Sequence, residues 1–232
     1  MRLDLTLQRR EGDEAFSFEF TRMVNAGYVG RNQEEVRRHI EELAAKGIPG
    51  PKRTPVLFPV VPRQIVLDGQ IDVFGDETSG EVEYVLFIKD ENTVYVGLGS
   101  DHTDRFLEET DIPRSKQVCP NVLCPKVWHL EDVREHWDEL LIKADVVSSG
   151  QRMAYQEGKL GLIMDPAALM DFVRDEIGGP LKDLIVYSGT LGLITGEFVS
   201  GEKFLAELID PILGRSLELK YEVLPLDYLK MD

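Results

Sequence analysis

Hydrophobic and polar residues alternate near both ends of the chain, a pattern typical of half-buried β-strands. Leucines alternate with polar residues from Leu3 to Leu7, and phenylalanines do so from Phe16 to Phe20. The turn-like segment QRREGDEA separates the two runs, so we predict an N-terminal β-hairpin. Residues 215–224 (RSLELKYEVL) alternate in the same way and predict a further strand.

Short apolar runs between these ends predict more strands. They lie at residues 56–61, 64–67, 71–74 and 81–88, from about Gly150 to residue 164, and at 184–190. Residues 106–125 have no clear periodicity, and we expect irregular structure there.

Two segments have the end signals of helices. Asn32 is a good N-cap, Glu35 follows at the capping-box distance, and Gly47 is a stop signal. Asp165 is the N-cap of another helix, which has proline at its first position and ends at Gly178-Gly179-Pro180.

A third helix is predicted at Leu130–Ala144, where Val133, Trp137, Leu140 and Leu141 would face inward. Strands separated by single, irregularly placed helices indicate an α+β fold rather than a doubly wound parallel sheet.

The composition excludes several classes of partner. The chain has 232 residues and a formal net charge of −16, which argues against nucleic acid or an anionic membrane as a partner. No run approaches the length of a membrane span, and the N-terminus lacks the apolar region of a secretory signal, so we expect a cytoplasmic protein. Cys119 and Cys124 are then expected to be reduced, with a local disulfide as the alternative.

Three acidic residues form the main chemical signal. If residues 81–88 are a strand, Glu81 and Glu83 share one face of it, and Asp101 follows in the turn SDHTDR. Like charges this close need a cation or a proton between them, and carboxylates suit Mg²⁺, Mn²⁺ or Ca²⁺. The alternative is a solvated edge strand that is simply acidic.

Ordered motifs around these acids resemble those of the fumarylacetoacetate hydrolase (FAH) superfamily. The matching segments are Gly30-Arg31-Asn32, Pro55–Phe58, Glu81-Val82-Glu83, Ser100–Arg105, Ser115-Lys116 and Ser188–Gly192. The resemblance implies a mixed β-sheet and β-roll core with a few peripheral helices. It also implies an N-terminal hairpin arm at residues 1–26, a single catalytic domain at residues 27–232, and a homodimer or larger homo-oligomer.

The resemblance further implies that Glu81, Glu83 and Asp101 bind one divalent cation, usually Mg²⁺ or Mn²⁺. The cation would chelate a small oxo-acid substrate and stabilise an enolate. Lys116 would add positive charge near the developing oxyanion, unless it is an ordinary surface lysine.

Four residues are implied to bind the substrate in such a site. They are Arg31, Ser188, Gly189 and Thr190. Arg31 could instead pair with one of the acidic ligands, and the other three could form a plain glycine turn.

The chain departs from the family pattern at the proton-transfer pair. Val36 occupies the usual histidine position and His39 the usual glutamate position. His39, oriented by Glu35 or Glu42, is a substitute, or else a packing histidine. Two further positions depart as well, because Glu108 replaces an amide and Leu191 replaces a proline.

Two residues beside Asp101 are additional candidates. His102 could be a fourth ligand or an acid–base group, although the corresponding family position is usually apolar and faces the core. Arg105 ends the Ser100–Arg105 motif and is a further candidate.

The leading hypothesis is a metal-dependent hydrolase or decarboxylase that acts on a C–C bond of an acylpyruvate or a β-keto acid. The alternatives are a hydratase or isomerase of unsaturated oxo-acids, and a ligand-binding protein that has kept the fold without the chemistry.

Overall fold

The computed structural model describes residues 1–45, 50–51, 53–67 and 69–229, apart from the side chains of residues 39 and 42–45. The strands are β1 Arg2–Arg9, β2 Gly12–Glu19, β3 Arg22–Gly27, β4 Val56–Pro59, β5 Ile65–Leu67, β6 Gly69–Val73, β7 Thr78–Ser79, β8 Val82–Asp90, β9 Thr93–Asp101, β10 Thr103–Asp104, β11 Asn121–His129, β12 Leu141–Ser148, β13 Gln151–Lys159, β14 Leu184–Tyr187, β15 Lys203–Asp210 and β16 Arg215–Pro225. The helices are α1 Gln33–Ala45, α2 Arg105–Glu108, α3 Ile112–Val118 and α4 Pro166–Ile177, with 3₁₀ turns η1 Pro62–Gln64, η2 Leu130–Asp132, η3 Arg134–Glu139 and η4 Leu160–Leu162.

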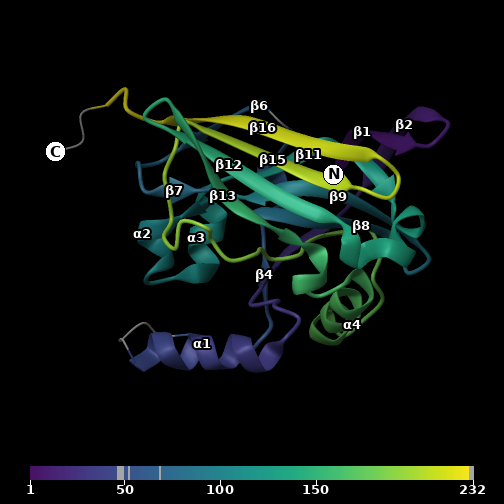
Figure 1. Cartoon of the computed structure of the whole chain (residues 1–232), viewed down its shortest axis with the longest axis horizontal. Coiled ribbons are helices and arrows are strands. Elements are labelled where there is room, and N and C mark those ends of the chain that lie inside the picture. Colours follow the sequence, from purple (N-terminus) through teal and green to yellow (C-terminus); the bar gives the residue numbers. More distant parts are fainter. Residues whose placement is uncertain (46–49, 52, 68, 230–232) are drawn as a thin grey trace.

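Two mixed sheets form the body of the molecule, which confirms the predicted α+β class (Figure 1). The larger sheet has the order β2-β1-β11-β9-β8-β14-β3-β4, and β5 also pairs with β11. The smaller sheet has the order β13-β12-β15-β16-β6. Apolar side chains of both sheets, among them Leu86 and Phe204, belong to one buried cluster, to which Leu169 of α4 also contributes.

The predicted N-terminal hairpin is confirmed. Strands β1 and β2 pair in antiparallel register from Arg2↔Glu19 to Arg9↔Gly12, and β1 joins the large sheet through parallel pairing with β11. The inward residues of the hairpin form a second core with the other face of β8, where the Phe18 ring meets the Phe87 ring edge-on at 5.3 Å. The division of the chain at residue 26 stays a prediction.

Two of the predicted helix starts are confirmed by their caps. The Asn32 side chain accepts hydrogen bonds from the backbone N–H groups at the start of α1, and Asp165 does the same for α4. Gly178 ends α4 with a left-handed φ of 68°. The predicted stop of α1 at Gly47 lies outside the described residues.

The predicted helix at Leu130–Ala144 is wrong. The segment forms two 3₁₀ turns with a non-helical residue at His136, and then enters β12 at Leu141. From Leu140 onward, buried and half-buried residues alternate, so the strand period replaces the helical one. Val133, Trp137 and Leu140 are nevertheless buried, as the helical pattern predicted.

The expectation of irregular structure at residues 106–125 is also wrong. Asp104 and Asp111 cap the short helices α2 and α3, which are too short to show a hydrophobic period. Strand β11 follows, and its register shift between Leu123 and Val127 accommodates the proline at position 125.

Two expectations about the whole chain can be compared with the structure. No helix in the described part of the chain is long and apolar enough to cross a membrane. Cys119 and Cys124 are both buried and form no disulfide, so the alternative of a local disulfide is wrong.

The core between the sheets predicts the outcome of a simple truncation. Leu86 is fully buried there, so Leu86→Ala should lower the free energy of unfolding by about 2–5 kcal/mol. Chemical denaturation measures this loss. Leu162→Ala is the matched control, because Leu162 is 61% exposed and its truncation should change stability by less than about 0.5 kcal/mol. Equal losses in the two variants would contradict this description of the core.

Candidate metal centre

One strand register brings the three predicted carboxylates together. The backbone N–H of Glu81 donates to the Asp101 carbonyl at 3.1 Å, and the N–H of Asp101 donates to the Glu81 carbonyl at 3.0 Å. Glu83 faces Gly99 two residues further along the same face. Carboxylate oxygens of Glu81, Glu83 and Asp101 lie within 4.8 Å of one another. The grouping matches the prediction, although Glu81 precedes β8 rather than beginning it.

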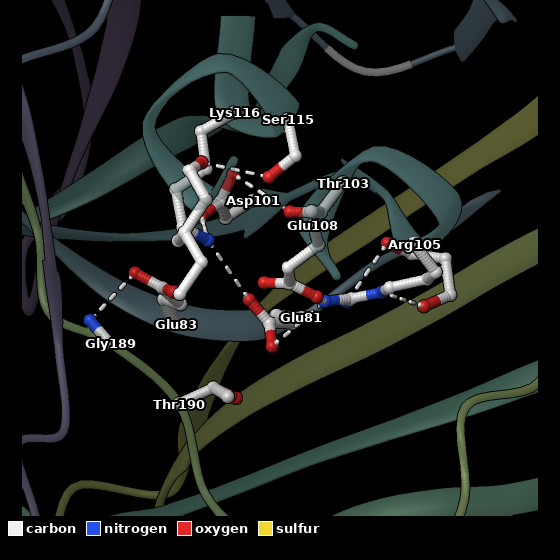
Figure 2. Close-up of polar contacts among 12 residues, drawn as sticks. Glu81, Glu83, Asp101, Thr103, Arg105, Glu108, Ser115, Lys116, Gly189 and Thr190 are labelled. Atoms are coloured by element: carbon white, nitrogen blue, oxygen red, sulfur yellow. Dashed lines mark hydrogen bonds and ion pairs between the residues drawn. The ribbon is translucent and has the colours of Figure 1, made fainter. Parts of the chain in front are cut away.

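Two cations approach the carboxylates from the short helices that follow β10. Lys116 of α3 donates from Nζ to Asp101 Oδ2 at 2.5 Å and lies 3.5 Å from Glu81 Oε2. Arg105 of α2 reaches Glu81 Oε1 at 3.4 Å. Figure 2 shows both cations contacting Glu81.

Arg105 is held in place on several sides. Its Nε donates to Ser79 Oγ at 2.7 Å, and its Nη1 donates to Glu108 Oε2 at 2.7 Å. The guanidinium carbon lies 3.8 Å from the centre of the Phe198 ring, a cation–π contact. Arg105 therefore belongs to the site as a fixed charge.

Burial and like charge set the ionisation of this cluster. Burial, Asp101 and Glu81 raise the pKa of Glu83 well above 4.5. Burial also acts to raise the pKa of Glu81, but Arg105 and Lys116 lower it overall. Burial acts to lower the pKa of Lys116, yet Asp101 and Glu81 raise it above its ordinary value, so this lysine stays charged.

The fully ionised cluster has an excess of negative charge. Its four acids and two bases are Glu81, Glu83, Asp101, Glu108, Lys116 and Arg105. Four negative and two positive charges leave two negative charges without a counter-charge, and one divalent cation would neutralise them. Because the three grouped ligands offer only oxygen atoms, the residues fit a hard cation such as Mg²⁺, Mn²⁺ or Ca²⁺.

Gly189 supports the carboxylate cluster through its backbone. Its N–H donates to Glu83 Oε2 at 2.8 Å. The residue has a φ of 80°, and a Cβ there would lie 2.6 Å from the Val29 side chain and 2.9 Å from the Ala26 carbonyl oxygen. Only glycine fits this approach. The N–H that was predicted to bind substrate therefore positions a carboxylate.

The hydroxyl groups predicted to bind substrate are engaged within the protein. Thr190 Oγ1 donates to the Val82 carbonyl at 2.6 Å and accepts from Gln156 Nε2 at 2.7 Å. Gln156 Oε1 in turn accepts from the Val82 N–H at 3.0 Å. Ser188 Oγ donates to the Gly189 carbonyl at 2.7 Å. Both hydroxyl groups thus have partners within the protein, and their role in binding substrate stays a prediction.

Two other predicted site residues point elsewhere. Arg31 forms a bidentate ion pair with Asp138 at 2.7 and 2.8 Å, and Asp138 is not among the three grouped carboxylates. His102 projects from the opposite face of the strand, where its ring nitrogens contact Tyr221 and Thr78 at 2.9 Å each. Burial lowers the pKa of His102 to about 3. His102 is therefore a buried residue with partners away from the carboxylates, and the prediction of it as a ligand is wrong.

The predicted proton-transfer residues remain unplaced. His39 and Glu42 lie on α1, which runs to one side of the sheets in Figure 1. Their side chains lie outside the described part of the structure.

The sequence reasoning missed two residues next to the cluster. Gln156 is fully buried and joins the Thr190 turn to β8, but nothing in its sequence context marks it. Tyr28 has an unusual positive φ of 58°. Burial, Glu108 and Glu81 raise the pKa of its hydroxyl. Tyr28 lies two residues before the Gly30-Arg31-Asn32 motif, and this position in the sequence could have drawn attention to it.

Comparisons with known proteins agree with the fold. The family described as "Protein of unknown function (DUF2848)" matches residues 26–221. No curated protein matches the sequence significantly. Among solved structures, Cg1458 is 13% identical with a TM-score of 0.65, over 97% of this chain and 100% of that one.

Two further solved structures have names that describe an enzyme. The 2-hydroxyhepta-2,4-diene-1,7-dioate isomerase from Mycobacterium marinum is 14% identical with a TM-score of 0.63, over 98% of this chain and 99% of that one. A 2-keto-3-deoxy-D-arabinonate dehydratase complexed with magnesium and 2,5-dioxopentanoate is 16% identical with a TM-score of 0.59, over 93% and 78% respectively. At these identities the likeness shows a shared fold.

The raised pKa of Glu83 predicts how pH affects the metal-free protein. The folded state keeps a proton on Glu83 well above pH 4.5, whereas the unfolded chain releases it near its ordinary value of 4.5. The stability contributed by this protonation is therefore lost as pH rises above about 4.5. Glu83→Gln should remove this loss and therefore stabilise the metal-free protein at about pH 8 relative to the wild type.

Chemical denaturation with a chelator present, at about pH 5 and about pH 8, measures this difference. The stabilisation should shrink toward the lower pH. If the stability difference between the variant and the wild type is the same at both pH values, the surroundings of Glu83 do not raise its pKa.

Proposed function

Since the chain belongs to the DUF2848 family of proteins of unknown function, we propose from its site that it is a divalent-cation-dependent enzyme acting on a small oxo-acid. The observation that carries the proposal is the buried group Glu81, Glu83 and Asp101 with Lys116 against it. We also propose that the family is a branch of the FAH superfamily, on the motifs of this sequence and the fold it shares.

The named neighbours support an oxo-acid as substrate. The dehydratase was solved with magnesium and 2,5-dioxopentanoate, which is an oxo-acid. The isomerase is named for a hydroxy-dienoate, the enol form of an unsaturated oxo-acid. These facts concern the neighbours. For this chain they support the proposal of an oxo-acid substrate, which its own residues already suggest.

The chemistry of the site follows from its charges. A bound divalent cation supplies Lewis acidity toward adjacent oxygens of the substrate and stabilises enolate charge. Lys116 holds a permanent positive charge beside that position, because its raised pKa keeps it from acting as a base. Gly189 keeps Glu83 oriented through its N–H.

The leading reaction is cleavage of a C–C bond, either by hydrolysis of an acylpyruvate or by decarboxylation of a β-keto acid. Both pass through an enolate. Hydration or isomerisation of an unsaturated oxo-acid is the second candidate, and the names of the dehydratase and isomerase neighbours favour it. Product analysis distinguishes the two classes, since only cleavage yields a second acid or carbon dioxide.

Metal binding is the first test. Calorimetric titration with Mg²⁺ or Mn²⁺ should show one site per chain in the wild type. Glu83→Ala should weaken binding by at least about 100-fold, because it removes one of three charged ligands. Glu157→Gln, at an exposed acid of β13, should bind like the wild type. Equally weak binding by the wild type and Glu83→Ala would exclude the metal site.

Replacement of Lys116 separates binding from turnover. Lys116→Met removes a cation that contacts Asp101 and Glu81, so the affinity for Mg²⁺ should stay the same or rise. Turnover of an oxo-acid substrate should fall by about 10²–10³ in kcat, the usual cost of losing one group that stabilises an oxyanion. Steady-state kinetics at saturating Mg²⁺ measures this.

An unchanged kcat in Lys116→Met would remove this lysine from the mechanism. Absence of turnover on acylpyruvates, oxaloacetate and 2-hydroxy-dienoates in a wild type that binds metal would favour the ligand-binding alternative.

A further inference from the structure

The acids of the charged cluster differ in their exposure to solvent. Among the acids, the Asp101 side chain is only 1% exposed, Glu81 is 14% exposed and Glu108 is 21% exposed. Lys116 is nearly as buried as Asp101. Solvent thus reaches the cluster at Glu81 and Glu108, and we call this exposed side of the two residues its opening.

Glu108 is fixed at this opening. Its Oε2 accepts from Arg105 Nη1 at 2.7 Å, and the same nitrogen lies 3.4 Å from Glu81 Oε1. Helix α2, which carries Glu108, is capped by Asp104, whose side chain accepts from the Leu107 N–H at 2.8 Å. The Glu108 carboxylate thus stays beside a proposed metal ligand.

The cations near the opening already have acidic partners. Arg105 contacts Glu81 and Glu108, and Lys116 contacts Asp101 and Glu81. Arg31, which the sequence suggested for the substrate, is engaged by Asp138. In the described part of the chain, the two cations of the cluster are thus already paired with acids, and a second carboxylate placed beside Glu108 would add a like charge.

Two aromatic residues border the same region. Tyr28 is half-buried, and the charged groups that act on its hydroxyl are Glu108, Glu81 and Lys116. Ala26 and Val29, close to Tyr28 in the sequence, lie against Gly189, whose N–H donates to Glu83. Phe198 is 49% exposed and stacks on Arg105 from another segment of the chain. These rings offer apolar surface and one hydroxyl group to a ligand.

We propose that Glu108 determines substrate specificity, so that the site accepts 2-oxo-monocarboxylic acids with an uncharged tail and rejects those with a second carboxylate. The inference rests on the proposed function, since the oxo-acid head is placed at Glu81, Glu83 and Asp101. The tail lies toward Glu108, Tyr28 and Phe198. Like-charge repulsion from Glu108 disfavours a tail carboxylate, whereas the aromatic rings tolerate an alkyl or hydroxylated tail.

The test uses two compounds that differ only at the tail. 2-Oxopentanoate and 2-oxoglutarate have the same chain length and the same oxo-acid head, and only the second has a tail carboxylate. Isothermal titration calorimetry of the Mg²⁺-loaded full chain should show 2-oxopentanoate binding at least about ten-fold more tightly. Glu108→Gln keeps an oxygen that can accept from Arg105, and it should reduce this ratio to less than about three-fold.

A matched control variant and the ratio of the two affinities in the wild type test the proposal. Glu109→Gln changes the neighbouring, exposed acid and should keep the wild-type ratio. If the wild type binds 2-oxoglutarate as tightly as 2-oxopentanoate, the proposed selectivity fails while metal-dependent binding stands. A wild-type ratio that Glu108→Gln leaves unchanged also overturns the role of Glu108. If neither compound binds and Mg²⁺ itself is not bound, the proposed function fails together with this inference.

Discussion

The repulsion among three buried carboxylates is the constraint around which the centre of this protein is organised. Glu83 and Asp101 are almost fully buried, and their charges are costly without compensation in such surroundings. Lys116 compensates Asp101 directly, and Arg105 compensates Glu81. Glu83 has only a backbone N–H as a partner among the hydrogen bonds described. The shortage of compensation at Glu83 is what makes a divalent cation the natural complement of the site.

Different parts of the chain supply different kinds of support. The charged groups come from one continuous stretch, residues 81–116, which contains β8, β9 and the two short helices. The neutral contacts come from far away in the sequence, from Gly189 after β14 and from Gln156 on β13. Because β14 pairs with β8 on one side and β3 on the other, the distant turn is placed against Glu83 by the sheet itself.

The fold class, the hairpin and the two capped helices could be predicted because each has a local cause. Alternation along a strand and a side chain that caps a helix involve residues close in sequence, such as Asn32 with Glu35 or Asp165 with Ala168. The failures had a different origin. The apolar residues of 130–144 fit a helix and a turn-plus-strand equally well, and the pairing of β12 with β13 and β15 decided between them. Helices α2 and α3 were missed because neither is long enough to show a period.

Local spacing could place the three acids together, whereas their role as metal ligands was implied by the resemblance of the surrounding motifs to the FAH superfamily. Glu81 and Glu83 share a face in any strand, and a single antiparallel partner is enough to bring Asp101 opposite them. Tertiary structure decided what the surrounding polar groups do. Thr190, Arg31 and His102 each took the hydrogen-bond partner that the fold presented, which was Val82, Asp138 and Tyr221 respectively. The spacing of residues along a strand determines which face of the sheet a side chain occupies. Its hydrogen-bond partner, in contrast, depends on strands and loops from distant parts of the chain.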